Sequence, residues 1–267
     1  MAASVLKTFN VHLQGNPMAK ETLIMAHGYG SEQNAWRFIT PAFKDRYRIV
    51  LFDWMGCGAS DYASYNFNHY KNLNAYAEDL ITICDTLGIK SSVMLCHSVS
   101  SMIAAIASNQ RPDLFSKMVF IGASPRYLND ADYLGGFDQP TLDSIFTAMG
   151  MNYAAWAQGF SPAAMNSPET PAMEVEFLHS LTTMRPDISL ALARIIFLSD
   201  HRSDITKINL PVLLLQMKDD LVVPQSVAEY MHSVIPNSQL RQIEARGHFP
   251  HMSRPAELMR VVSEYLQ

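Results

Sequence analysis

The residue best placed for chemistry is Ser98, within the run Leu-Cys-His-Ser-Val-Ser at residues 95–100. This run joins an apolar segment, typical of a buried strand, to a helical pattern. A serine at such a junction lies on a sharp turn that raises its hydroxyl above the sheet edge, where it can act as a nucleophile. The usual pattern is Gly-x-Ser-x-Gly, and the small residues Cys96 and Ser100 replace both glycines here. Serine is also a common helix cap, so the motif alone does not decide between the two roles.

A serine nucleophile needs an imidazole that accepts its proton and a carboxylate that orients the imidazole. His248 follows Gly247 after one expected strand, and Asp219 and Asp220 follow another. The order serine, aspartate, histidine along the chain is that of α/β-hydrolases. We favour Asp220 as the carboxylate because the run Asp-x-x-x-Pro, ending at Pro224, has the spacing usual in these enzymes. Asp219 remains the alternative.

The remaining histidines do not suggest a metal site. His251 competes with His248 for the role of base, but we expect it to cap or pack at the start of the last helix. His97 is expected to pack within the turn that carries Ser98. The other histidines are scattered, without the spacing of metal ligands.

A glycine-rich turn, His-Gly-Tyr-Gly at residues 27–30, follows the expected strand 22–26. It lacks the Gly-x-Gly-x-x-Gly spacing of a dinucleotide site, so we expect no nucleotide and no other cofactor. The turn can instead supply half of an oxyanion hole, in which the backbone amides of Tyr29 and Val99 stabilise the oxygen that gains charge. A plain glycine turn is the alternative interpretation.

These groups need a scaffold that brings them together. Helical patterns occupy residues 73–87, 99–109 and 255–266, and short apolar strand patterns occupy residues 22–26, 48–52, 92–95, 117–121, 212–216 and 239–243. The alternation predicts an α/β fold, with a mostly parallel sheet flanked by helices on both faces. The amino-terminal residues run into an alternating strand-like pattern and lack the apolar core of a signal peptide.

Residues 122–211 interrupt this alternation and are too long for an ordinary crossover. They are rich in Phe, Met, Trp and Leu, and they divide into helical pieces at 139–149, 153–160, 172–182 and 188–198. The expected breaks between these pieces are Pro162, Pro168, Pro171 and Pro186. We expect a hydrolase core of residues 1–125 and 200–267, with residues 126–199 inserted as a helical lid above the carboxyl ends of the strands, where such sheets bind ligands.

Composition excludes several classes of protein. The chain has 267 residues with a formal net charge of −5, and only 17% of them are charged, against 48% hydrophobic. These values exclude a disordered chain and argue against a nucleic-acid binder, which needs a basic surface. No apolar run reaches the roughly 18 residues of a membrane span. Three cysteines form no disulfide framework, so we expect a cytoplasmic protein, also nuclear if the source is eukaryotic. Without a heptad pattern we expect a monomer.

With these motifs in view, the chain resembles the α/β-hydrolase family that contains the bacterial stress regulator RsbQ, the plant karrikin-insensitive receptor and the plant DWARF strigolactone receptor. The resemblance runs nearly end to end. It rests on His-Gly-Tyr-Gly at 27–30, His-Ser-Val-Ser at 97–100, Tyr-Leu-Asn-Asp at 127–130, Gly-Gly-Phe at 135–137, Trp-Ala-Gln-Gly-Phe at 156–160, Met-Arg-Pro-Asp-Ile at 184–188, Ser-Asp-His-Arg at 199–202 and Gly-His at 247–248. Residues 185–188 look like the plant receptors, whereas residues 199–202 look closer to the bacterial regulator.

The resemblance implies roles for particular residues. Ser98, Asp220 and His248 would form the triad, beneath a V-shaped lid of four helices. Tyr29 stands where relatives carry Phe. The substrate pocket would be lined by Phe137, Phe160, Phe177, Phe197 and Trp156. Without the family, packing between helices would explain these aromatic residues equally well.

Two functions follow from this site. The first is a serine hydrolase that cleaves a small apolar ester or a butenolide-type, strigolactone- or karrikin-like lactone, through an acyl-enzyme or a ring fragment carried on His248. The second is a slow-turnover receptor or stress-signalling regulator that binds the same small ligand and whose lid recruits a protein partner. C–C bond hydrolysis or lyase chemistry by the same triad is a third possibility.

Overall fold

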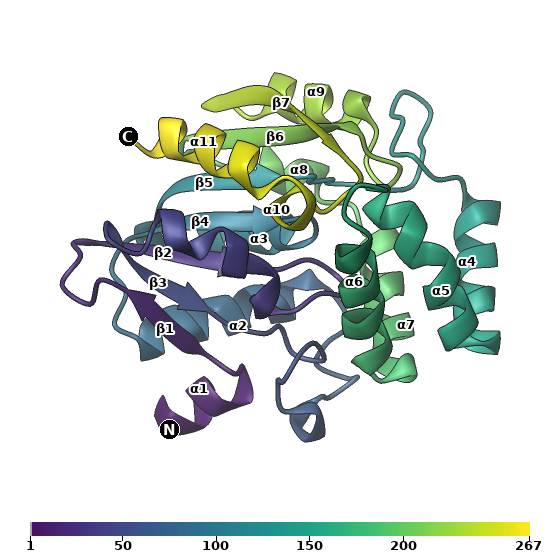
Figure 1. Ribbon diagram of the computed structural model, residues 1–267, viewed down its shortest axis with the longest axis horizontal. Coiled ribbons are helices and arrows are strands. Elements are labelled where there is room, and N and C mark those ends of the chain that lie inside the picture. Colours follow the sequence, from purple (N-terminus) through teal and green to yellow (C-terminus); the bar gives the residue numbers. More distant parts are fainter. Residues whose placement is uncertain (1) are drawn as a thin grey trace.

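The computed structural model describes residues 2–267 and contains a central seven-stranded sheet (Figure 1). The strand order is β1-β3-β2-β4-β5-β6-β7, with β1 antiparallel to β3 and every other neighbouring pair parallel. The strands are β1 (His12–Gly15), β2 (Glu21–Ala26), β3 (Tyr47–Leu51), β4 (Ser92–His97), β5 (Phe115–Ile121), β6 (Val212–Asp219) and β7 (Ser238–Arg246). The predicted mostly parallel α/β sheet is confirmed, and β1 adds an antiparallel edge.

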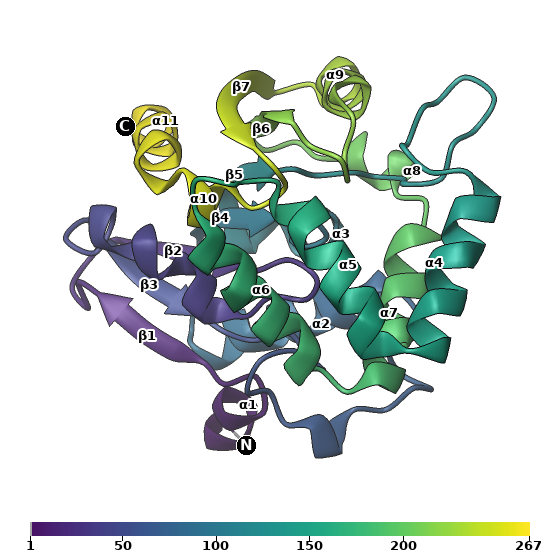
Figure 2. The same cartoon turned by 45° about the vertical axis from the view of Figure 1, so that its right-hand side comes forward.

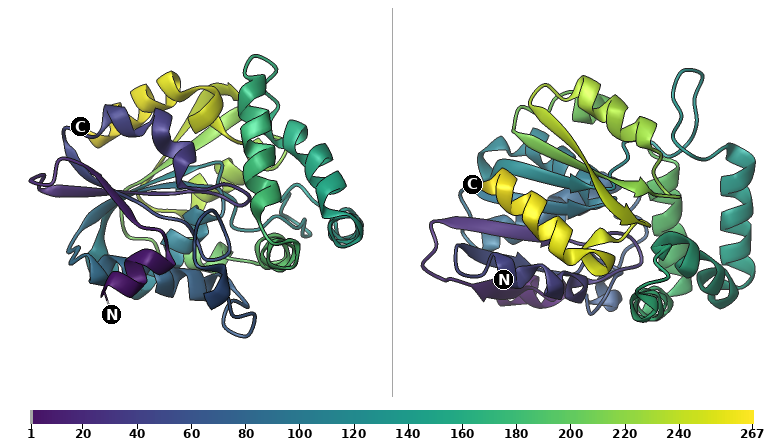
Figure 3. Two further views of the ribbon diagram at one scale, coloured as in Figure 1. Left: turned by 60° about the horizontal axis from the view of Figure 1, so that its bottom comes forward. Right: turned by 45° about the horizontal axis from the view of Figure 1, so that its top comes forward.

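Helices cover both faces of the sheet (Figure 3). One face packs against α2 (Leu73–Thr86), α3 (Ser100–Gln110) and α9 (Gln225–Val234), and the other against the 3-10 helix η1 (Gln33–Phe38) and α11 (Pro255–Leu266). Because β4 and β5 lie between two covered faces, nearly all of their residues are buried, as continuous apolar runs predict.

Four helices of the inserted segment lie beyond the carboxyl ends of the strands (Figures 1 and 2). They are α4 (Gln139–Met151), α5 (Tyr153–Met165), α6 (Pro171–Thr183) and α7 (Pro186–Phe197). We call residues 126–199, which contain them, the lid segment, after the role that we propose for them below. Helix α4 packs beside α5 and α7, and α5 packs beside α6.

The predicted break at Pro162 is wrong, because α5 continues through it to Met165. A proline in a helix interior usually disrupts the helix, but packing of the surrounding apolar residues can outweigh this local cost. Pro171 and Pro186 instead occupy the first turns of α6 and α7, where a missing N–H costs nothing.

Several short elements have no counterpart in the sequence patterns. They are α1 (Ala2–Thr8), α8 (Arg202–Ile205), α10 (Pro250–Ser253) and the 3-10 turns η2 (Thr40–Ala42), η3 (Tyr62–Ser64) and η4 (Pro112–Leu114). The helix α9 is also additional. Across residues 2–267, no helix combines the length and the apolar character that a membrane span requires.

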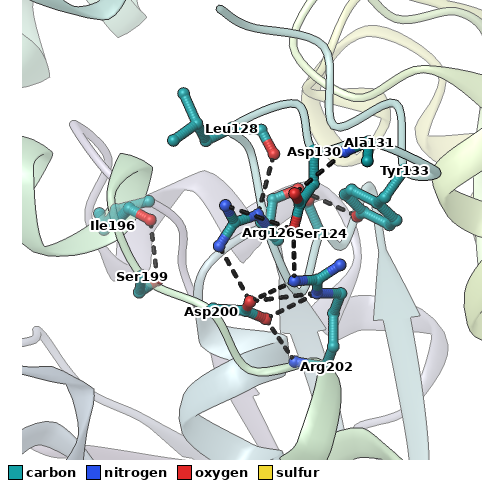
Figure 4. A network of polar contacts seen from close by, with 10 residues as sticks. All are labelled: Ser124, Arg126, Leu128, Asp130, Ala131, Tyr133, Ile196, Ser199, Asp200 and Arg202. Atoms are coloured by element: carbon teal, nitrogen blue, oxygen red, sulfur yellow. Dashed lines mark hydrogen bonds and ion pairs between the residues drawn. The ribbon is translucent and has the colours of Figure 1, made fainter. Parts of the chain in front are cut away.

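Both ends of the lid segment meet in one cluster of charges (Figure 4). Arg126, at the entry, contacts Asp200, at the exit, with 2.9 Å between Nη1 and Oδ2. Arg202 pairs with Asp200 at 2.6 Å and with Asp130 at 3.0 Å. Tyr133 donates a hydrogen bond to the carbonyl of Arg126 at 3.0 Å. The cluster therefore holds the two ends of the lid segment side by side.

Candidate active site

Ser98 lies between β4 and α3 in a left-handed backbone conformation, with φ of 56°. Its amide donates to the carbonyl of Ile121 on β5 at 2.8 Å, which anchors the turn to the neighbouring strand. A non-glycine residue with positive φ is strained and persists only where the surroundings require it. The hydroxyl of Ser100, at the position usually held by glycine, donates to the carbonyl of His27. The replacement therefore links this turn to the end of β2.

The structure brings Ser98, His248 and Asp220 into one hydrogen-bonded line. The Ser98 hydroxyl oxygen lies 2.8 Å from Nε2 of His248, and Nδ1 of His248 lies 2.7 Å from Oδ2 of Asp220. All three side chains are buried. The arrangement can transfer a proton from the serine to the imidazole while the carboxylate orients the ring.

Asp220 rather than Asp219 faces the histidine. The other oxygen of Asp220, Oδ1, accepts the amides of Val222 at 2.8 Å and Val223 at 3.2 Å, so the carboxylate is held in place from both sides. The side chain of Asp219 is 49% exposed and pairs with Arg246 at 3.3 Å.

His248 is held through its backbone as well as its ring. Its amide donates to the carbonyl of Ala164 on α5 at 2.7 Å, and its carbonyl accepts from Nε2 of His97 at 2.7 Å. Burial holds the pKa of His97 well below its usual range. The ring is therefore neutral, and its single N–H lies on the nitrogen that donates to this carbonyl. His97 thus packs beside the site, as expected, and also supports His248.

Two backbone amides beside the serine are free to bind an anionic oxygen. Within the described chain, neither the amide of Tyr29 nor that of Val99 donates to a protein acceptor. A Cβ added to Gly28 would lie 2.5 Å from the His97 ring and 3.1 Å from Cβ of Ser98, so only glycine lets this loop approach the nucleophile so closely.

Tyr127 is a site residue that the sequence motifs did not single out. Its hydroxyl lies 3.4 Å from the Ser98 hydroxyl oxygen, in a long contact, and burial raises its pKa, which keeps the phenol protonated. The available signal was weak, because Tyr127 opens one of the segments that carry the family resemblance but has no motif of its own.

Two of the predicted pocket residues lie beside Tyr127. The ring of Phe197 is 4.9 Å from that of Tyr127 and 5.4 Å from that of Phe137. The structure therefore connects Phe137 and Phe197 to Ser98 through Tyr127.

The other three form a second aromatic row. The ring of Trp156 stacks on Phe160 at 5.1 Å, Phe160 lies 6.2 Å from Phe177, and Phe177 lies 4.2 Å from Phe249, the residue after His248. The row therefore runs from α5, across α6, to the histidine loop.

A groove of about 330 Å³ lies between α6 and the loops that follow β2 and β3. Phe177 lines it, but Trp156, Phe160, Phe137 and Phe197 do not. Its lining residues are Ser31, Glu32, Asn34, Ala35, Gly58, Ala59, Glu176, Phe177, His179, Ser180, Thr183 and Met252. A substrate pocket made by all five predicted residues stays a prediction.

Competing reactive groups are buried away from the hydrogen-bonded line. The His251 ring lies 4.6 Å from each of Trp36 and His97, and burial lowers its pKa to about 3. Burial raises the pKa of the Cys96 thiol, so this residue stays protonated. In the part of the chain that the structure describes, no three His, Cys, Asp or Glu side chains gather as metal ligands.

Comparisons with known proteins agree with this geometry. A family profile described as "alpha/beta hydrolase fold" matches residues 21–255. The chain is 42% identical to "Strigolactone esterase D14" from Arabidopsis thaliana, over 96% of this chain and 95% of that protein. It is 38% identical to "Karrikin insensitive 2 receptor CA" from Petunia hybrida, over 98% and 97% of the two chains. The solved structure of a hydrolase from Oleispira antarctica, 33% identical, superposes with a TM-score of 0.96 and covers 100% of this chain and 97% of that one.

The fold, the strained serine between β4 and α3, and these matches lead to one assignment. The chain belongs to the α/β hydrolase fold family, within the group that includes the strigolactone esterases and the karrikin-insensitive receptors.

Proposed function

We propose that this protein is a serine hydrolase that cleaves a small, largely apolar ester or a butenolide-type lactone. The observation that carries the proposal is the line of hydrogen bonds from Ser98 through His248 to Asp220, which begins at a residue held in a strained backbone conformation. The relatives named as a strigolactone esterase and as a karrikin-insensitive receptor support the substrate class.

The geometry supports a two-step mechanism. Ser98 attacks the carbonyl carbon while Nε2 of His248 takes the hydroxyl proton, and Asp220 stabilises the resulting imidazolium. The amides of Tyr29 and Val99 bind the oxygen that becomes negative. His248 then passes its proton to the leaving oxygen, which leaves an acyl group on Ser98. Water, deprotonated by His248, releases the acid.

We assign residues 126–199 to a lid over this site and the aromatic residues of the lid segment to the substrate pocket. The ring of Phe197 contacts that of Tyr127, beside the serine, and the ring of Phe137 packs against Phe197, which supports an apolar site with few polar groups. The buried and unpaired cysteines, Cys57, Cys84 and Cys96, support a reducing, cytoplasmic location.

A slow-turnover ligand sensor is the second candidate, and one contact favours it. The lid carbonyl of Ala164 accepts the amide of His248 at 2.7 Å, so a change at the catalytic histidine can alter the lid and the surface it offers to a partner protein. Lid motion that limits product release would give this slow turnover.

The test replaces Ser98 with Ala and measures hydrolysis of p-nitrophenyl acetate and of a fluorogenic butenolide. We expect Ser98→Ala to lose at least about 10³-fold in kcat. The matched control is Ser108→Ala, which removes a buried hydroxyl on α3 that donates to Ala105. Hydrolysis by Ser98→Ala at the wild-type rate would reject the serine as nucleophile.

Pre-steady-state kinetics separate the two candidates. Repeated turnover at a constant rate supports the enzyme. A stoichiometric burst followed by almost no turnover supports the sensor, and intact mass then shows whether Ser98 or His248 carries the fragment.

A further inference from the structure

Three hydroxyl groups form a buried line between the oxyanion loop and the lid segment. The Tyr29 hydroxyl lies 2.5 Å from the hydroxyl oxygen of Ser189, which lies 2.9 Å from the hydroxyl of Tyr153. The Tyr153 hydroxyl lies 2.7 Å from the carbonyl oxygen of Leu181. Ser189 is fully buried, and Tyr29 and Tyr153 are 9% and 8% exposed.

Elementary donor and acceptor rules fix which hydroxyl donates and which accepts in each of these hydrogen bonds. A carbonyl can only accept, so Tyr153 donates its single proton to Leu181. The Tyr153 oxygen then accepts from Ser189, and the Ser189 oxygen accepts from Tyr29. Each hydroxyl therefore has its proton committed, and removing any one leaves the next without its donor. The Tyr29 hydroxyl also lies 3.3 Å from the backbone carbonyl oxygen of Ser189, a longer contact that remains when the Ser189 hydroxyl is removed.

The line connects four parts of the fold. Tyr29 lies in the loop after β2, Ser189 on α7, Tyr153 on α5 and Leu181 on α6. Three of the four lid helices are thus tied to the loop that carries the Tyr29 amide. We call these three hydroxyls and the Leu181 carbonyl the hydroxyl relay.

The loop is also held on either side of Tyr29. The carbonyl of His27 accepts from Nε1 of Trp54 at 3.0 Å, and the carbonyl of Gly28 accepts from the amide of Ser31 at 3.3 Å, whereas the side chain of Tyr29 itself is held by the relay. Gly28 and Gly30 flank Tyr29, and Gly30 has a φ of 73°, which favours glycine. A Cβ added to Gly30 would lie 2.7 Å from Leu181 and 3.2 Å from Phe177, so the loop also packs closely against α6. A segment flanked by glycines has many conformations when free, and the relay selects one of them.

We propose that Tyr29 and Ser189 are positioning residues, through which closure of the lid segment holds the Tyr29 amide in its oxyanion-binding place. The inference rests on the proposed function, because it assigns a second task to a residue whose amide binds the oxyanion. Tyr29 thereby couples closure of the lid segment to binding of the oxyanion, because the lid segment engages its hydroxyl and its amide binds the reacting oxygen.

The test uses Tyr29→Phe, Ser189→Ala and the double variant, with Tyr47→Phe as the matched control. Tyr47 is a buried tyrosine at the start of β3, at the opposite edge of the sheet from the site. Each relay variant should lower kcat for p-nitrophenyl acetate about 10-fold, because the amide is misplaced rather than removed. KM should stay within about twofold, and affinity for an aryl trifluoromethyl ketone, which needs the oxyanion hole, should fall with kcat.

The double variant gives the sharper result. Both substitutions act through one line, so the double variant should lose no more than the worse single variant. Additive losses, or a lower melting temperature with unchanged kcat, would overturn the proposal. If Ser189→Ala fails to fold, Tyr29→Phe with Tyr153→Phe replaces the pair.

Hydrogen exchange separates failure of this inference from failure of the proposed function. If the wild type shows no Ser98-dependent hydrolysis, the proposed function fails, but exchange at the amide of Ser31, which donates to the carbonyl of Gly28 at 3.3 Å, still reports the relay. Faster exchange there in Tyr29→Phe and Ser189→Ala, but not in Tyr47→Phe, supports the coupling. Unchanged exchange overturns it.

Discussion

The amide of His248 donates a hydrogen bond to the carbonyl of Ala164, 2.7 Å away in the last turn of α5. That carbonyl is available because a helix leaves its last four carbonyls without intrahelical donors. The residue that would otherwise supply the donor is Pro168, which has no N–H. The proposed general base is therefore held by the lid segment as well as by the core.

Gly247 is the point at which this contact can be broken. It has a φ of 73°, and a Cβ added to it would overlap the carbonyl oxygen of Met165. Gly247→Ala should move His248 away from α5 and lower kcat about 10²-fold. Gly88→Ala is the matched control, because Gly88 has a φ of 65° but no atom within 4 Å of an added Cβ. It should lower stability by about 1–2 kcal/mol and leave kcat unchanged. Equal kcat losses in the two variants would show that backbone strain alone, rather than the contact with α5, is responsible.

Replacing Asp220 and replacing Asp219 should have very different effects. Asp220→Asn keeps the shape of the side chain but can stabilise the wrong tautomer of His248, so kcat should fall about 10⁴-fold with little change in KM. Asp219→Asn removes only an exposed ion pair with Arg246, and kcat should change less than about threefold. Steady-state kinetics with p-nitrophenyl acetate checks both. A larger loss in Asp219→Asn would reassign the carboxylate.

His251 should make the protein less stable in acid. Burial lowers its pKa to about 3 from the ordinary value of 6.5, so the folded state leaves it neutral where the unfolded chain binds a proton. The free energy of unfolding therefore loses about 1.4 kcal/mol per pH unit from this residue as pH falls from about 6.5 towards 3. His27 and His97, whose pKa values burial also lowers, add to the slope.

Urea unfolding of the wild type and of His251→Leu between pH 8 and pH 5 checks this effect. In the described structure neither ring nitrogen of His251 has a hydrogen-bond partner, so leucine leaves no polar group unpaired. The variant should show a pH slope that is smaller by one proton. Parallel curves for the two proteins would contradict the linkage.

The charge cluster at the base of the lid segment should contribute more to the free energy of unfolding than a surface ion pair does. The side chain of Arg126 is 18% exposed and that of Asp200 is 33% exposed. A double-mutant cycle with Arg126→Met and Asp200→Asn should give a coupling of about 1–2 kcal/mol. The control cycle on Arg185 and Asp187, which are 50% and 53% exposed, should give less than about 0.5 kcal/mol. Equal couplings would mean that the cluster adds nothing beyond ordinary surface pairing.

Sequence patterns predicted most of the fold, because the spacing of apolar residues that distinguishes strands from helices is a local property of the chain. Residues 255–266 were expected as a helix and form α11 with the same bounds, since Pro255 marks its first turn and apolar residues recur on one face. The extent of α5 was not predictable in this way. Its continuation past Pro162 depends on packing against distant parts of the chain.

The same distinction applies to the site. The motifs at Ser98, Asp220 and His248 point to one site, because they follow strands whose carboxyl ends share an edge. The contact of Tyr127 with Ser98 and the pairing of Tyr29 with Ser189 have no such local signal. They depend on how the lid segment folds back over the sheet, which sequence spacing does not describe.

The amide of His201 donates to the carbonyl of Pro125 at 2.8 Å, so the chain leaves the sheet and returns to it through adjoining peptide groups. An insertion with such neighbouring ends can change in length or sequence without altering the spacing of the strands beneath it. The whole segment can therefore be exchanged during evolution while the strands and the residues at their carboxyl ends keep their positions. Because we propose that this segment covers the site, a laboratory chimera joined at Pro125 and His201 should take the ligand preference of the protein that donates the segment.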